Sequence, residues 1–165
     1  MNLWHLLKRA NLKQLWELLT LSLGNIRLLW PTYKATKQAV KYSNELYGAQ
    51  HHKNTPANAF RHAIWNWLIA KECRKCQKNS KKVLKWTERI TGMHEKILPG
   101  DALSNAMDIH NNAVGRSVFF KFDEHDPEKA LTILRKMTNQ SKKVNSLDDL
   151  KLYSEVQLVH LIDPH

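Results

Sequence analysis

The chain has 165 residues, of which 42% are hydrophobic, a size and composition typical of one globular domain that folds without disulfides or a structural metal. Its two cysteines, Cys73 and Cys76, lie one helical turn apart, which excludes a disulfide framework and favours a reducing, cytoplasmic location. The net charge of +11 is uneven, because residues 1–85 carry 16 Lys or Arg against three acids and residues 86–165 carry 10 against 12. We therefore expect an anionic partner, either nucleic acid or an anionic membrane surface.

The N-terminal segment, residues 1–30, is rich in Leu and Trp and predicts an amphipathic helix ahead of the main helical domain, residues 31–165. Charged side chains such as Lys8 and Lys13 interrupt its apolar run, so we expect neither a signal peptide nor a transmembrane segment. The apolar residues between positions 3 and 23 surround most of the helix. Such a segment can dock on the domain core, on a protein partner or on a membrane interface, and the last would make the protein membrane-peripheral.

Apolar residues recur with a helical period along most of the chain, and prolines and glycines separate the periodic segments. Pro31 and Pro127 stand where new segments begin, and Gly48 and Gly115 follow segments that end. The predicted fold is all-α, a compact single-domain bundle of about six or seven helices, in which Glu155–Ile162 is the one stretch that resembles a strand. Helices are predicted near residues 2–23, 31–47, 56–78, 80–98, 101–115, 126–139 and 146–158.

The helix predicted at 56–78 brings polar side chains toward the interior. It carries two opposite apolar stripes, and one of them includes Asn58, His62 and Trp65. A helix that is apolar on two sides usually runs through the middle of a domain, which would bury His62 beside Trp65. Arg61 lies between the two stripes. We therefore expect a histidine, an amide and a guanidinium close to the core.

The next two predicted helices, 80–98 and 101–115, also turn histidines inward. His94 falls near the centre of the apolar stripe of the first helix, with Glu95 at its edge, and His110 falls inside the stripe of the second. The neighbouring face of the second helix carries three more polar residues, Asp108, Asn111 and Asn112. A buried polar group without a partner costs roughly 1–3 kcal/mol, so three inward histidines are hard to explain by packing alone and indicate a functional site.

Two kinds of chemistry fit the five catalytic candidates, which are His62, His94, Glu95, Asp108 and His110. All of them except His62 are also candidate ligands of a divalent metal ion, which would activate a bound water. Alternatively, His62 or His94 acts as a general base that a carboxylate orients, while cationic and amide side chains stabilise anionic charge. The chain lacks the HExxH motif of many zinc hydrolases, so the sequence leaves the cofactor unknown and both mechanisms open.

Seven cations are concentrated between residues 71 and 85, where Glu72 is the only acid. Because they straddle the end of one predicted helix and the start of the next, they can form one surface patch that recruits a polyanion. A solvated helix end explains the same charges without a partner. This basic cluster consists of Lys71, Arg74, Lys75, Lys78, Lys81, Lys82 and Lys85.

Three strings of this region, Asn58–Asn66, His94-Glu95 and Ala106–Arg116, resemble an uncharacterised bacterial all-helical domain family. Its pattern is N-x-F-R-H-A-x-W-N … H-E … M-D-x-H-N-N-x-x-G-R, and the family also occurs at the C-termini of polymorphic toxins. The resemblance makes residues 58–116 the signature core and, by association with toxins, implies an enzyme that attacks nucleic acid, lipid or cell wall. The candidate substrate-binding residues are signature positions of this pattern, namely Asn58, Arg61, Trp65, Asn111, Asn112 and Arg116.

Three hypotheses for function follow, and the third is a small protein that docks on a protein partner through residues 3–23. In the first, the protein is a hydrolase whose His/Asp/Glu site acts on an anionic phosphodiester-containing substrate, either nucleic acid or phospholipid. In the second, it is a non-catalytic helical module that binds nucleic acid or a membrane surface, and its polar interior only specifies the core. The inward-facing histidines favour the hydrolase, because binding through a surface cluster does not require them.

Overall fold

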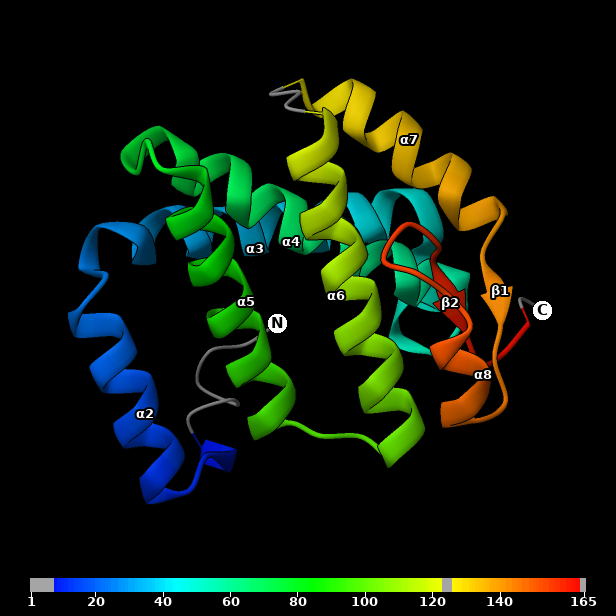
Figure 1. Ribbon diagram of the computed structural model, residues 1–165, viewed down its shortest axis with the longest axis horizontal. Coiled ribbons are helices and arrows are strands. Elements are labelled where there is room, and N and C mark those ends of the chain that lie inside the picture. Colours follow the sequence, from blue (N-terminus) through cyan, green and yellow to red (C-terminus); the bar gives the residue numbers. More distant parts are fainter. Residues whose placement is uncertain (1–7, 123–125, 164–165) are drawn as a thin grey trace.

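The computed structural model describes residues 8–122 and 126–163, and the fold is all-α in a single compact domain, as the sequence predicts (Figure 1). The part of the predicted N-terminal helix that falls on residues 1–7 lies outside the described residues. The helices are α2 (Leu12–Leu23), α3 (Ile26–Tyr47), α4 (Pro56–Cys76), α5 (Ser80–Ile97), α6 (Ala102–Phe122), α7 (Pro127–Asn139) and α8 (Leu147–Lys151), with a 3₁₀ helix η1 (Gly48–His52) and two short strands, β1 (Lys142–Lys143) and β2 (Val159–His160). Within the described ranges, no helix has both the length and the apolar character that spanning a membrane requires.

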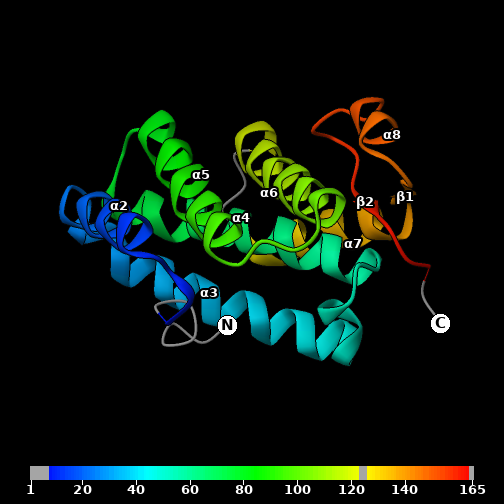
Figure 2. The same ribbon diagram turned by 90° about the horizontal axis from the view of Figure 1, so that it is seen from below.

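Helix α4 is the central element of the bundle. Figure 2 shows it running between α3 on one side and α5 and α6 on the other, and α7 packs against it as well. Every residue from Ala57 to Ala70 except Arg61 is buried, which confirms that this helix is covered on opposite sides. Polar side chains on α4 therefore lie among those of its neighbours rather than in water.

Helices α4 and α6 cross very closely at Gly115. The sequence predicts that a helix ends at this glycine, but α6 continues through it to Phe122. A Cβ atom at Gly115 would lie only 2.1 Å from the carbonyl oxygen of Ala63 on α4, so no larger residue fits there without moving a backbone. The glycine is a packing position, and the close crossing brings the neighbouring turns of α4 and α6 into side-chain contact.

Helix α3 also differs from its prediction. It begins at Ile26 rather than at Pro31, and Pro31 lies buried inside it. The proline stands in the second turn, where its missing N–H removes a single intrahelical bond and its fixed φ suits the helix. Because the segment between α2 and α3 is so short, the two helices meet at a corner.

The C-terminal region is less helical than predicted. Only Leu147–Lys151 of the expected helix 146–158 forms, and β2 pairs in parallel with β1, with Lys142 opposite Val159. The side chain of Asn111 on α6 completes this small sheet, because its Nδ2 donates to Val159 O at 2.9 Å and its Oδ1 accepts from Val159 N at 3.1 Å. Within the strand-like stretch at residues 155–162, only Val159 and His160 form a strand, which α6 holds in place.

Candidate acid–base site

His62 on α4 is the centre of a polar site built by three helices, and only 2% of its surface is exposed. Its Nδ1 atom lies 3.1 Å from Asn112 Oδ1 on α6 and 3.4 Å from Glu95 Oε1 on α5. Its Nε2 atom lies 3.2 Å from Asp108 Oδ1 on α6 and 2.8 Å from the Nη2 atom of the adjacent Arg61. The two ring nitrogens therefore face two different environments.

The Nδ1 side of His62 is a closed hydrogen-bond network. Asn112 donates from Nδ2 to Glu95 Oε1 at 3.0 Å, which turns its Oδ1 toward His62. That same Oδ1 accepts from Asn66 Nδ2 at 2.6 Å. Because the oxygen of Asn112 can only accept, the network assigns a proton to Nδ1 of His62. Nε2 then carries the lone pair, to which Arg61 donates.

Further hydrogen bonds from α5 and α6 hold the side chain of Asn66 in place. Its Oδ1 accepts from Thr91 Oγ1 on α5 at 3.2 Å and from Arg116 Nη1 on α6 at 3.1 Å. Arg116 Nη2 in turn lies 3.8 Å from the exposed carboxylate of Glu88. We call Glu95, Asn112, Asn66 and Thr91 the inner network. It links all three helices and fixes the orientation of the His62 ring.

The two carboxylates of the site are tuned in opposite directions. Burial acts to raise the pKa of Glu95, but hydrogen bonds from His62 and Asn112 outweigh it and hold that pKa below its ordinary value. Burial also raises the pKa of Asp108, and the nearby charges of His62 and Arg61 do not compensate. A pair of carboxyl groups with separated pKa values is typical of acid–base sites, where one stays ionised and the other can hold a proton.

A pocket of about 220 Å³ is lined by His62 and by Arg61, whose Nη2 atom lies beside Nε2 of His62. His94 lies in its wall with its ring edge-on to Trp65, at a centroid distance of 5.2 Å, and Trp65 donates to Thr36 Oγ1 at 2.8 Å. Burial lowers the pKa of His94 to about 4, so its ring is neutral at physiological pH. The described lining residues are Thr36, Ala39, Val40, His51, His52, Arg61, His62, Trp65 and His94.

Several buried polar atoms on this side have no protein partner among the described residues. They include Nδ1 of His94 and Nδ1 of His51, which both line the pocket, whereas Oδ1 of Asp108 has no hydrogen bond but lies 3.2 Å from His62 Nε2. Burial lowers the pKa of His51 to about 4 as well, and its Nε2 lies 2.7 Å from Asn44 Oδ1. Unpartnered buried polar atoms are rare and costly, and here they gather around one pocket, which indicates room for a polar ligand or water.

Most of the residues predicted from the sequence meet at this site, but three of them do not. His110 points its Nε2 atom at Gln157 O, at 2.8 Å, and Asn111 holds Val159. Residues two apart on a helix differ by about 200° in direction, so His110 cannot join Asp108 on the same face. Asn58 is buried at the start of α4, and its Oδ1 has no hydrogen-bond partner in the described part of the chain.

The structure also shows where the four candidate metal ligands lie. The four candidate ligands were His94, Glu95, Asp108 and His110, and the last of these faces the C-terminal segment instead. Over residues 8–122 and 126–163, no group of three or more His, Cys, Asp or Glu side chains is placed to hold a metal ion. The donors that do converge are a histidine ring, two carboxyl groups, a guanidinium and amides, a set suited to proton transfer.

Sequence reasoning missed some residues of the site. Asn66 stands at the end of the first signature string, and the pair His51-His52 comes only a few residues before α4, so both had a visible signal. Thr36 and Thr91 had no such signal in the sequence, because nothing distinguishes them from other threonines on partly buried helices. Their roles depend on partners from distant parts of the chain.

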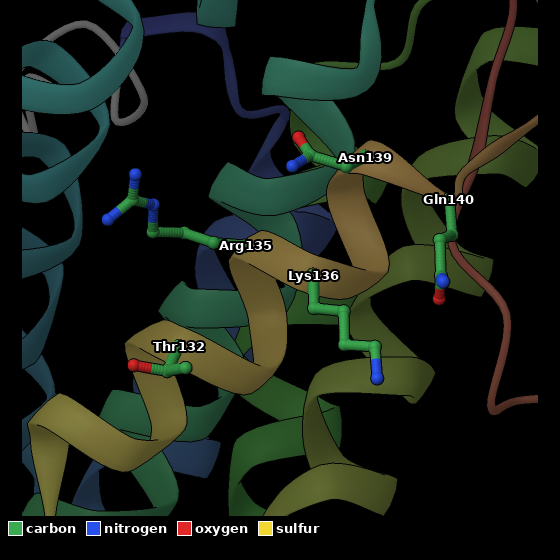
Figure 3. A pocket seen from close by; sticks show the side chains of 5 residues that line it. All are labelled: Thr132, Arg135, Lys136, Asn139 and Gln140. Carbon is green, nitrogen blue, oxygen red and sulfur yellow. The ribbon is translucent and has the colours of Figure 1, made fainter.

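A second hollow, of about 410 Å³, lies along α7 and is lined by Thr132, Arg135, Lys136, Asn139 and Gln140 (Figure 3). Figure 3 shows these side chains leaving the helix in different directions, so they do not converge on one point. This hollow is larger than the pocket beside His62, but it lacks convergent polar groups. We therefore place the candidate site at His62.

Comparison with known proteins identifies the family but no closer relative. No curated protein and no solved structure matches the chain. A family model described as "Domain of unknown function (DUF6973)" matches residues 19–142, which is well over half of the chain and includes His62, Glu95, Asp108 and Asn112. The chain therefore belongs to this family of domains of unknown function.

Proposed function

We propose that this protein is a hydrolase in which His62 moves the protons that cleave a phosphodiester bond of an anionic substrate. The observation that carries the proposal is the asymmetry of the His62 ring. Glu95 and Asn112 hold Nδ1, whereas Nε2 carries the lone pair and lies beside Arg61, which lines the pocket together with His62. A ring held in one tautomer by a carboxylate and an amide is ready to accept a proton at its other nitrogen.

In the proposed reaction, the phosphate of the substrate takes over the hydrogen bond of Arg61, and the lone pair that this frees on Nε2 of His62 accepts a proton from a water molecule. The water oxygen forms a bond to phosphorus, the bond between phosphorus and the leaving oxygen breaks, and the leaving oxygen takes a proton from the carboxyl group of Asp108, which becomes a carboxylate beside the imidazolium of His62. Glu95 and Asp108, at 3.4 and 3.2 Å from the ring nitrogens, stabilise the positive charge on the imidazolium. Burial raises the pKa of Asp108, which also makes it a candidate donor of the second proton.

The walls of the pocket support an anionic substrate. Arg61 and four histidines line it, and no carboxylate is among its described lining residues. Its 220 Å³ is below the roughly 300–1,000 Å³ of most small-molecule sites, so it suits one phosphate with a small attached group better than a duplex. The resemblance to domains at the C-termini of polymorphic toxins points to attack on nucleic acid or lipid by association.

A second candidate function is a non-catalytic binding module. The inner network favours it, because Asn112 and Asn66 bond to each other and to further groups, as a network that only specifies the core would do. The polar atoms left unpartnered on the pocket side do not fit this alternative. A core network gains nothing from leaving His94 Nδ1 and His51 Nδ1 without hydrogen-bond partners.

The test compares two histidine substitutions on the full chain. His62→Gln removes the proposed base, and His110→Gln changes a histidine whose Nε2 atom bonds to Gln157 O in the C-terminal segment. Hydrolysis would be measured on bis(p-nitrophenyl) phosphate, single-stranded DNA, RNA and phosphatidylglycerol vesicles. We expect cleavage of at least one of them, a loss of about 10²-fold or more in His62→Gln, and little change in His110→Gln. Wild-type protein that cleaves none of them, or a fully active His62→Gln, would contradict the proposal.

A further inference from the structure

The α2 helix presents a line of large apolar side chains to solvent. Leu12, Trp16, Leu19 and Leu23 are 86%, 67%, 48% and 66% exposed. Their spacing of four, three and four residues keeps all of them within about 60° on the helix surface. The opposite side of α2 packs on the domain, where Leu21 is buried and Glu17 pairs with Lys96 of α5. The exposed line is therefore a surface of the folded domain.

The first turns of α3 continue this pattern. Ile26, Trp30 and Tyr33 repeat the same spacing and are 66%, 71% and 47% exposed. The rings of Trp30 and Tyr33 lie 5.6 Å apart, and the Nζ atom of Lys37 lies 5.7 Å from the centre of the Tyr33 ring. Monomeric soluble proteins rarely expose so many large apolar side chains on consecutive turns. We call these residues the apolar stripe: Leu12, Trp16, Leu19, Leu23, Ile26, Trp30 and Tyr33.

The basic cluster lies at the same end of the molecule as the apolar stripe. Figures 1 and 2 both show the corner between α2 and α3 beside the turn between α4 and α5. Contacts between these elements confirm the placement, because Thr32 on α3 accepts from Trp86 Nε1 on α5 at 2.9 Å and lies 3.6 Å from Cys73 Sγ on α4. Five lysines of the cluster are exposed there, namely Lys75, Lys78, Lys81, Lys82 and Lys85.

The charge around the stripe is also strongly positive. Residues 8–41 contain seven Lys or Arg and one acid, and that acid, Glu17, is occupied by Lys96. Lys34 lies 3.9 Å from Glu72, so one of the few acids of this end is likewise paired. An apolar surface with exposed Trp and Tyr and a surplus of cations has the composition of a segment that lies in a membrane interface.

We propose that this end of the protein binds the surface of an anionic lipid bilayer. The Trp and Leu side chains of the apolar stripe enter the headgroup region, and the lysines around them contact lipid phosphates. A nucleic acid would engage the lysines but leave the apolar stripe in water, whereas a bilayer engages both. The surface is separate from the pocket beside His62, and its test measures binding, so its failure would leave the proposed hydrolase untouched.

The test measures binding of the full chain to vesicles by flotation. One set of vesicles contains phosphatidylglycerol and the other only phosphatidylcholine. The stripe variant is Trp16→Ser with Trp30→Ser, and its control is Phe120→Ser with Leu152→Ser, two residues that are 64% and 79% exposed outside the stripe. Because all four side chains are largely exposed, we expect each variant to fold, which thermal melting and circular dichroism would check.

We expect wild type and the control to bind phosphatidylglycerol vesicles, with binding that weakens as salt is raised, and to bind phosphatidylcholine vesicles much less. The stripe variant should bind about tenfold more weakly. Lys78→Ser with Lys81→Ser should lower binding by about the same factor. Absence of binding to anionic vesicles, equal binding by the stripe variant and its control, or a preference for RNA that the Trp substitutions do not weaken would overturn the proposal.

Discussion

The two sides of the His62 ring differ in how their polar atoms are partnered. On the Nδ1 side, Glu95, Asn112 and Asn66 each make hydrogen bonds within one buried network. On the Nε2 side, Asp108 Oδ1 and His94 Nδ1 are buried without a hydrogen-bond partner among the described residues. Leaving such atoms unpartnered opposes folding, and the protein accepts that cost on one side only. The difference indicates that the inner network holds the ring and that the pocket side meets a ligand.

The largest expected effect comes from breaking the inner network. Asn112→Leu keeps the side-chain volume similar but removes the donor to Glu95 and the acceptor of His62, which leaves a buried carboxylate short of partners. We expect a loss of about 3–5 kcal/mol in the free energy of unfolding, measured by urea denaturation. Asn139→Leu on the exposed face of α7 is the matched control and should change stability by about 0.5 kcal/mol or less. Equal losses would mean that the network does not stabilise the fold.

The two carboxylates offer a sharper comparison between the sides. Glu95→Gln replaces the carboxylate that accepts hydrogen bonds from His62 and Asn112 with a neutral amide. Because these bonds become weaker, we expect a loss of about 2 kcal/mol in the free energy of unfolding. Asp108→Asn removes a carboxylate whose pKa burial raises, so stability should change by no more than about 1 kcal/mol while hydrolysis falls by about 10²-fold. Melting curves and rates of both variants give the result. A large drop in melting temperature for Asp108→Asn with unchanged activity would sink the assignment of Asp108 to the reacting side.

Acid should destabilise the protein partly through His94. Burial lowers the folded-state pKa of His94 to about 4 from its ordinary 6.5, so the unfolded chain binds more protons between these two values. Its contribution is complete above pH 6.5 and declines as pH falls toward 4, with about 2 kcal/mol lost by pH 5. Denaturation at pH 7 and pH 5 should show this decline in wild type and in the exposed-site control His52→Gln. His94→Gln should decline about 2 kcal/mol less, and an equal decline would contradict the burial of a neutral His94.

The helical period was enough to predict the centre of the site. The helical period predicts that His62 and His94 face inward from two helices, and the signature strings add Arg61 and Asn112. Such predictions succeed because α4 is buried nearly all round, so a polar residue on it must find a partner. The same reasoning placed the all-α bundle, and it placed both ends of α4, α5 and α7 to within two residues.

The helical period of the apolar residues does not predict the site correctly where a helix has two buried sides that pack against different neighbours. Helix α6 turns Asp108 and Asn112 to α4 and α5 but turns His110 and Asn111 to the C-terminal segment. Nothing in the local sequence tells these two faces apart. Gly115 misled for a related reason, because its role depends on the backbone of Ala63, about 50 residues away. Long-range packing decides such positions, and one sequence does not report it.

The proton on the His62 ring gives the most direct test of the account. Isotope-labelled nitrogen NMR distinguishes protonated from unprotonated ring nitrogens, and His62→Gln would assign the signals. We predict that the neutral ring carries its proton on Nδ1, because Asn112 Oδ1 and Glu95 can only accept from it. A His62 ring with its single proton on Nε2 and a bare Nδ1 would contradict the division between a held side and a reacting side.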